Sequence, residues 1–137
     1  MERFIEIPGK PMAKGRPRVG KFGTYTPRET VNYENLVKTV YWQKYGNDEK
    51  FINEPVKIEI WAYFEPTQAE KKSKNKMEKL IGNPYIKKPD ADNITKIICD
   101  ALNGIAYEDD NLLSTVMIYK LYSEKAKVQV RISNDEI

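Results

Sequence analysis

The chain has 137 residues, and its 40% hydrophobic and 31% charged residues are typical of a folded globular protein rather than a disordered one. This length suits one compact domain, so we expect residues 1–137 to form a single domain. The formal net charge of +3 is small, but basic and acidic residues are segregated along the chain. No apolar stretch is long enough to span a membrane and no secretory signal pattern is present, which predicts a cytoplasmic protein.

The residue types that are missing exclude much of enzyme chemistry. The sequence contains no histidine and a single cysteine, Cys99. Histidine-dependent catalytic triads, histidine-ligated metal sites, intrachain disulfides and cysteine-cluster metal sites are therefore excluded. Any catalysis has to use carboxylates, lysine, tyrosine or serine.

The N-terminal part predicts a short strand at 2–7 that ends at Pro8. The segment 9–26 mixes Gly and Pro with basic side chains, a composition that predicts an extended loop rather than a helix or strand. Its basic residues alternate with Phe22 and Tyr25, which suits phosphate contacts combined with base stacking. The alternative is a mobile loop without a function.

A helix and a strand follow this loop. Thr26 as N-cap, Pro27 at the first helical position and Glu29 as the capping-box partner predict a helix start, and apolar spacing extends the helix over 27–45. Strict alternation of apolar and polar residues then predicts a strand over 55–64.

A lysine-rich segment comes next. Thr67 and Glu70 repeat the capping-box pattern and predict a helix that runs to about Ile81. Its apolar face is thin, so the lysines either lie in solvent or bind an anion. Both interpretations stay open from this segment alone.

The last third predicts one helix and two strands. Apolar periodicity over 94–102 predicts a helix that ends at Gly104, and 115–122 and 128–132 read as strands of a closing hairpin. The order β, α, β, α, α, β, β predicts an α+β domain, with a small mixed sheet of about four strands and helices packed on it.

The acidic residues between 90 and 110 are the candidates for chemistry. Asp90 and Asp92 lie at the start of the third helix and, if this stretch is extended, point to the same side. Lys96 lies one helical turn beyond Asp92, on the same face. The acidic run at 108–110 arrives from a separate loop after the helix.

Two short acidic segments separated by one helix provide the oxygen ligands that Mg²⁺ prefers. Such a site fits phosphodiester hydrolysis, in which the metal activates a water and Lys96 either neutralises charge in the transition state or positions that water. No small-molecule organic cofactor is expected. The structural alternative uses Asp as helix N-cap, Asp92 with Lys96 as an ordinary ion pair, and the acidic run as a turn.

Several motifs together resemble the signature of the RusA family of Holliday junction resolvases. The matching motifs are KPDADN at 88–93, Lys96, DALNG at 100–104, YEDD at 107–110, and GKPMAKGRPRV at 9–19 followed by TYTP. The hairpin-like C-terminal end is also similar to the family, so the resemblance extends over nearly all of the chain. One departure is the longer spacing that residues 12–15 create before the RPR run.

The resemblance implies a RusA-like fold and an endodeoxyribonuclease that acts in DNA recombination and repair, in bacteria or their prophages. It implies a homodimer that binds four-way DNA junctions and cuts two strands symmetrically with Mg²⁺ or Mn²⁺. By motif position, Asp90, Asp92 and Asp110 are the metal-binding carboxylates, and Lys96 is the catalytic lysine. Asn93 follows the Asp pair, where it helps to hold the substrate.

The basic segments then gain a function as phosphate contacts, which makes affinity fall as salt rises. The residues expected to contact DNA are Lys14, Arg16, Arg18, Lys21, Lys71, Lys72, Lys74, Lys76, Lys87, Lys88 and Asn93. Asp100, inside the helix near its end, is assigned to structure. Two alternatives stay open: a metal-dependent nuclease for branched DNA with little junction selectivity, and a non-catalytic DNA-binding protein.

Overall fold

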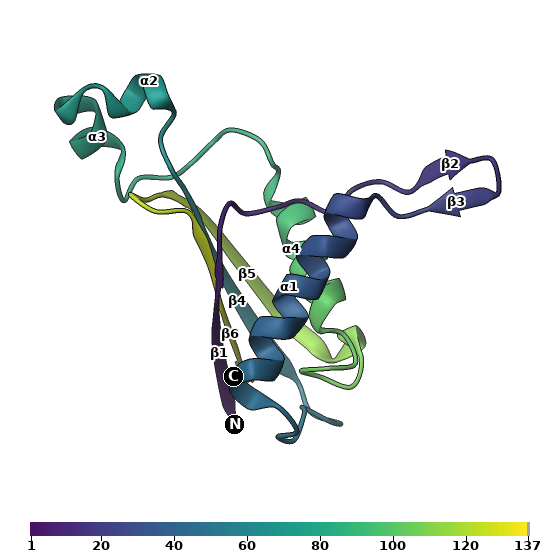
Figure 1. Cartoon of the computed structure of the whole chain (residues 1–137). Coiled ribbons are helices and arrows are strands. Elements are labelled where there is room, and N and C mark those ends of the chain that lie inside the picture. The colour runs from purple at the N-terminus through teal and green to yellow at the C-terminus, as the bar shows by residue number, and fades with distance from the viewer. Residues whose placement is uncertain (137) are drawn as a thin grey trace.

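A computed structural model of the chain describes residues 1–136 (Figure 1), so Ile137, the end of the expected single domain, lies outside the described residues. Four strands form one sheet: β1 (Glu2–Pro8), β4 (Val56–Phe64), β5 (Leu113–Tyr122) and β6 (Lys127–Asn134), in the order β1-β6-β4-β5. β4 and β5 are parallel, and the other neighbours are antiparallel. The predicted α+β class with a mixed sheet of four strands is confirmed.

The predicted C-terminal hairpin is wrong. β5 and β6 follow each other closely in sequence, but β4 lies between them and pairs with both. Side chains on β4 alternate between buried and half-buried along its whole length, so a central position buries its apolar face best. The chain between β4 and β5 makes the long crossover connection that parallel strands require.

Two helices cover one face of the sheet (Figure 1): α1 (Arg28–Tyr45) and α4 (Ala91–Leu102). Their buried residues join those of the strands in the core, and each fully buried large apolar side chain contributes about 1.5–3 kcal/mol. The residues that α4 buries are Ile94, Ile97, Ile98, Cys99, Ala101 and Leu102. Because this side of α4 faces the core, its opposite side is left to solvent.

The start of α1 differs from the prediction. The helix begins at Arg28, Pro27 occupies the N-cap position, and no side chain caps the helix, so the capping box of Thr26 and Glu29 is wrong. Pro27 has an extended backbone, and its carbonyl accepts the N–H groups of Thr30 and Val31. Backbone hydrogen bonding therefore replaces the expected side-chain cap.

The lysine-rich helix is two short helices, α2 (Gln68–Lys71) and α3 (Lys74–Leu80). The capping box of Thr67 and Glu70 is confirmed, but Ser73 starts a second helix by accepting the N–H of Lys76. We call α2 and α3 the lysine lobe. It projects beyond the end of the sheet (Figure 1), and its helices contain no buried residue.

The segment 9–26 contains an element that the sequence did not predict. β2 (Arg18–Gly20) and β3 (Gly23–Tyr25) form an antiparallel hairpin, which we call the hairpin arm. A turn at Lys21 and Phe22 joins them, and Gly23 has a φ of 115°, a conformation that favours glycine. The arm extends away from the body of the molecule on the side opposite the lysine lobe (Figure 1). Within residues 1–136, no helix is long and apolar enough to cross a membrane.

Candidate active site

The exposed side of α4 brings together the charged residues that the sequence singled out. Asp90 occupies the N-cap position with an extended backbone, and Asp92 lies in the first helical turn. Lys96 and Asp100 follow at intervals of four residues, which places them on the same side of the helix. Asp90, Asp92 and Lys96 are exposed, whereas Asp100 is half-buried.

The structural alternatives for these residues are not realised. Asp90 makes no capping hydrogen bond with its side chain. In the ion pairs formed within residues 1–136, neither Asp92 nor Lys96 takes part. Asp90 and Asp92 lie at the helix start as predicted, but the condition that 90–92 is extended is not met, because Asp92 already belongs to the helix. Its carboxylate lies at the helix N-terminus, where the backbone N–H groups favour negative charge.

Residues 108–110 follow α4, and we call them the acidic loop. Its two aspartates, Asp109 and Asp110, have different surroundings. Asp109 accepts the N–H of Asn111 through its side chain at 3.1 Å and so opens a short 3₁₀ helix, Asp110–Leu112. This hydrogen bond lowers the pKa of Asp109. A hydrogen bond with Asp109 raises the pKa of Asp110, and the nearby carboxylates of Asp109 and Asp100 raise it further. Asp109 is thus a turn residue. At Asp110, a bound cation would offset the repulsion from the neighbouring carboxylates.

Tyr107 fixes the acidic loop against α4. Its hydroxyl donates a hydrogen bond to the carbonyl of Cys99 at 2.6 Å, and its side chain is fully buried. Burial raises the pKa of the Cys99 thiol to about 11. The only cysteine is therefore a protonated core residue rather than a nucleophile.

The carboxylates have the right chemistry for Mg²⁺ but not a complete arrangement. Within residues 1–136, no three acidic or cysteine side chains form a group that could hold a metal ion. Asp90 and Asp92 lie at the start of α4, while Asp110 lies near Asp100, and the helix from 92 to 100 spans about 12 Å. Mg²⁺ commonly uses one or two protein carboxylates together with waters and phosphate oxygens. Asp90 and Asp92, two residues apart at the start of α4, could supply two such carboxylates, and within residues 1–136 no third acidic side chain completes a group with them.

Lys14 has a structural contact that the sequence did not predict. Its ammonium lies 2.9 Å from Glu34 and 3.2 Å from Asp100, so it joins the loop to both α1 and α4. Partial burial alone would lower the pKa of Lys14, but hydrogen bonds to these two carboxylates raise it. A phosphate contact by this ammonium would compete with both.

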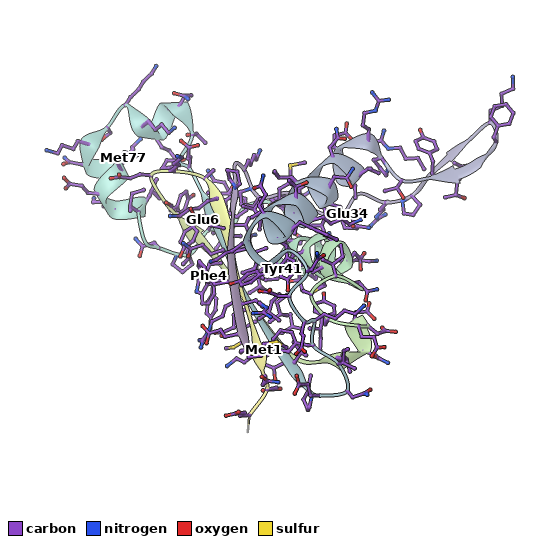
Figure 2. The ribbon with its side chains drawn as sticks, turned by 60° about the horizontal axis from the view of Figure 1, so that its bottom comes forward. Met1, Phe4, Glu6, Glu34, Tyr41 and Met77 are labelled. Carbon is purple, nitrogen blue, oxygen red and sulfur yellow. The ribbon has the colours of Figure 1, made fainter. Side chains whose placement is uncertain are left out.

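Backbone hydrogen bonds complete this anchor. The N–H of Lys14 donates to the carbonyl of Asn93 at 3.0 Å, and the N–H of Gly15 donates to the Thr30 hydroxyl at 3.0 Å. A Cβ atom on Gly15 would lie 2.6 Å from that hydroxyl oxygen, so only glycine fits here. Figure 2 shows Glu34 on α1, at the end from which the hairpin arm projects.

The anchored loop helps to form a hollow of about 490 Å³ over the start of α4, which we call the basic hollow. Its lining residues are Lys10, Arg16, Lys88, Pro89, Asp90 and Asn93. Three cationic residues thus line the hollow together with Asp90, a composition that suits a phosphate group next to a metal-binding carboxylate. The sequence predicts phosphate contacts for the basic segment that contains Lys10, but it did not single out this residue.

Apart from Lys87, which lies between α3 and α4, the other residues expected to contact DNA lie on two separate projections. Lys71 pairs with Glu65 at 2.8 Å and Lys87 pairs with Glu70 at 3.7 Å. Lys72, Lys74 and Lys76 are exposed on the lysine lobe, and Arg18 and Lys21 are exposed on the hairpin arm. Figures 1 and 2 place the two projections on opposite sides of the body, with Met77 marking the lysine lobe.

Comparison with known proteins points to one family. Residues 8–133 match the family model described as Endodeoxyribonuclease RusA. An uncharacterized protein of Bacillus subtilis (strain 168), YqaN, is 34% identical over 131 residues, which cover 90% of each chain. The segment matched by the family model includes the hairpin arm, α4 and the acidic loop.

Proposed function

Because the chain belongs to the RusA family of endodeoxyribonucleases, we propose that it resolves four-way DNA junctions as a homodimer, by paired and symmetric metal-dependent hydrolysis. One observation supports this most strongly. Asp90, Asp92 and Lys96 are exposed at the start of α4, and Asp90 lines the basic hollow. Within residues 1–136, none of the three has the side-chain cap or ion pair that would explain it structurally. A protein that only binds DNA has no need of exposed carboxylates beside its phosphate contacts.

The residues divide into two functions. Asp90 and Asp92 would hold Mg²⁺, or Mn²⁺ in its place, and the bound ion would supply Lewis-acid activation of a water and of the phosphate. Lys96 lies one turn from Asp92, where its ammonium stabilises the charge that develops on the scissile phosphate. The basic hollow holds the DNA backbone, with Asn93 as a hydrogen-bonding group.

A homodimer also accounts for the position of Asp110. In one chain, Asp110 lies toward the end of α4, apart from Asp90 and Asp92. We propose that dimerisation completes the metal site by bringing the acidic loop of one chain to the start of α4 in the other. A two-fold dimer would then present two equivalent sites, as symmetric cutting of a junction requires.

The exposed edge of β5 supports dimerisation. β5 pairs only with β4, and the chain at 83–85 covers only its far end. Val116, Met117 and Tyr119 keep 44%, 36% and 38% of their surface exposed. A long, partly apolar edge strand with free backbone groups pairs readily with another chain.

A substrate panel tests the proposed activity. The purified protein is incubated with a labelled synthetic four-way junction, a matched linear duplex and a flap, each with Mg²⁺, with Mn²⁺ or with EDTA. We expect paired, symmetric nicks that are confined to the junction and require the metal. Cutting of all three substrates would instead support a general branched-DNA nuclease, and binding without cutting in either metal would support a DNA-binding module.

A further inference from the structure

The tip of the hairpin arm exposes an apolar surface that the fold does not use. Phe22 keeps 97% of its surface exposed, Val19 keeps 87%, and Tyr25 keeps 52%. Single exposed apolar residues are common on proteins, but here three lie on one short projection. Because no residue of the described segment 1–136 buries the Phe22 ring, its capacity for apolar contact is available to a ligand.

The arm is held in a defined place. Lys14 and Gly15, just before β2, are fixed to both helices by the contacts described above. Arg18 pairs with Tyr25 in the ladder, and a Cβ on Gly20 would lie 3.0 Å from the Tyr25 ring, so the ring packs on the glycine. The base of the arm is therefore fixed next to the start of α4, and the arm presents Phe22 at its tip.

The charge around the tip identifies the kind of partner. No acidic residue occurs between Glu6 and Glu29, whereas the basic residues Lys10, Lys14, Arg16, Arg18, Lys21 and Arg28 do. The Lys21 ammonium lies 5.8 Å from the centre of the Phe22 ring. An aromatic ring beside a lysine, on a projection without acidic residues, is complementary to a polyanion that also presents flat aromatic faces, which describes nucleic acid. An anionic membrane surface is the competing partner, but it would not explain why the arm is anchored beside the basic hollow.

We propose that Phe22 is a wedge that stacks on a base at the branch point of the DNA and so favours branched DNA over continuous duplex. The proposal rests on the proposed function, to which it adds a residue that determines substrate selectivity. Inside a continuous duplex, both faces of each base pair are already stacked, so insertion has to break stacking. At a branch point, the terminal base pairs are more easily unstacked, so the ring gains a stacking partner at a lower cost.

Binding measurements with variants that do not cleave DNA test the wedge. All variants also contain Asp92→Asn, so that the DNA stays intact. The measured quantity is the ratio of the dissociation constants for a four-way junction and a matched linear duplex. Since stacking of an aromatic side chain on a base is worth about 5- to 150-fold in affinity, we expect Phe22→Ala to weaken junction binding about 10-fold or more. Duplex binding should change by less than about 2-fold, because no base is stacked there.

Three further comparisons make the result specific. Phe22→Tyr should restore junction binding, and Thr24→Ala, an exposed substitution on the same arm, should change neither substrate. A 2-aminopurine base at the branch point should gain fluorescence when the Asp92→Asn protein binds, and this gain should be lost with Phe22→Ala. The exposure of Phe22 means that circular dichroism and the unfolding midpoint should not change.

The outcomes separate the wedge from the proposed function. Equal losses on junction and duplex, or no loss on either, would overturn the wedge. Phe22-dependent binding to phosphatidylserine vesicles, with junction binding unaffected, would assign the tip to a membrane instead. Cleavage by the protein with Phe22 intact reports on the function separately: if it cuts junctions but Phe22→Ala keeps full selectivity, only the wedge fails. If it neither cuts nor binds any junction, both fail.

Discussion

Asp109 and Asp110 are neighbours in sequence, yet their hydrogen bonds separate their functions. Asp109 uses its carboxylate to hold the turn that opens the 3₁₀ helix, which lowers its pKa. Asp110 shares a hydrogen bond with Asp109 and faces further negative charge from Asp100, which raises its pKa. A cation bound at Asp110, as we propose, would remove this repulsion.

The raised pKa of Asp110 predicts that its charge destabilises the fold. Because the pKa in the folded protein lies above the unfolded value, the penalty is present above the folded pKa and disappears as the pH falls below it. We expect Asp110→Asn to raise the thermal unfolding midpoint at pH 7, and to have no such effect in acid. Under the proposed function, it should also abolish metal-dependent cleavage.

Asp109→Ala is the matched control, since it removes the turn hydrogen bond instead. The pKa of Asp109 is lowered in the fold, so its ionised form stabilises, and this stability is lost as the pH falls through the folded pKa. The substitution should therefore lower the unfolding midpoint at pH 7. A lower midpoint for Asp110→Asn at pH 7 would contradict the assignment of the two carboxylates.

Lys14 is the residue that connects the basic loop to both helices, and its removal should show in stability. In Lys14→Met, Glu34 and Asp100 face each other without their shared cation. Since these side chains are only partly exposed, we expect a loss of about 1–2 kcal/mol in the free energy of unfolding, measured with urea. Adding Glu34→Gln to this variant should recover part of the loss. Strict additivity of the two substitutions would show that the pair is not coupled.

At the scale of the elements, local sequence patterns predicted individual strands and helices, but they did not predict which strands pair with each other. The alternation in β4 and the apolar periodicity of α4 describe burial that each segment carries in its own sequence, and both were predicted. The position of β4 between β5 and β6 depends on contacts that neither strand encodes alone, so the hairpin prediction failed. The sequence pattern does not predict the hairpin arm, because its strands are only three residues long.

The same distinction holds for the candidate site. Asp90, Asp92 and Lys96 were found because their spacing lies within one helix. The contacts of Lys14 with Glu34 and Asp100 join three segments that are distant in sequence, and no local pattern reveals them. The basic hollow depends on the same long-range packing, so the sequence could not single out Lys10 within its basic segment.

The division of the lysine lobe into two helices predicts a local effect. Ser73 caps α3 by accepting the Lys76 N–H, and loss of such a cap costs about 0.5–2 kcal/mol. Because neither helix of the lobe has a buried residue, we expect Ser73→Ala to speed trypsin cleavage within 71–79 and to leave the global unfolding midpoint unchanged. Asn75→Ala, an exposed substitution in α3, should change neither the cleavage rate nor the midpoint. A large drop in the midpoint would mean that the lobe unfolds together with the body.

At the scale of the whole molecule, the start of α4 lies between two basic projections. The lysine lobe extends on one side of the sheet and helices, and the hairpin arm on the other (Figure 1). The basic hollow and the Asp90–Asp92 pair lie where α4 begins. A DNA molecule that contacts both projections would therefore pass over the candidate site.

The proposed homodimer predicts a change in mass for a substitution on β5. Val116→Lys places a charge on the exposed edge strand, which discourages pairing with another chain. We expect light scattering after size exclusion to show a dimer for the unmodified protein and a monomer for this variant. Val31→Lys, which alters a similarly exposed valine on α1, should stay dimeric. A monomeric unmodified protein, or a dimer unaffected by Val116→Lys, would contradict dimerisation through β5.

The proposed cutting of DNA depends on the carboxylates at the start of α4. The measurement that tests it most directly compares the unmodified protein, Asp92→Asn and Asp48→Asn on one labelled four-way junction with Mg²⁺, recording both binding and nicks. We predict that Asp92→Asn binds the junction as well or better, because a repulsive carboxylate is removed from the phosphate path, but makes no nicks. Asp48→Asn, an exposed substitution outside the site, should cut normally. Normal cutting by Asp92→Asn would contradict the assignment of the active site.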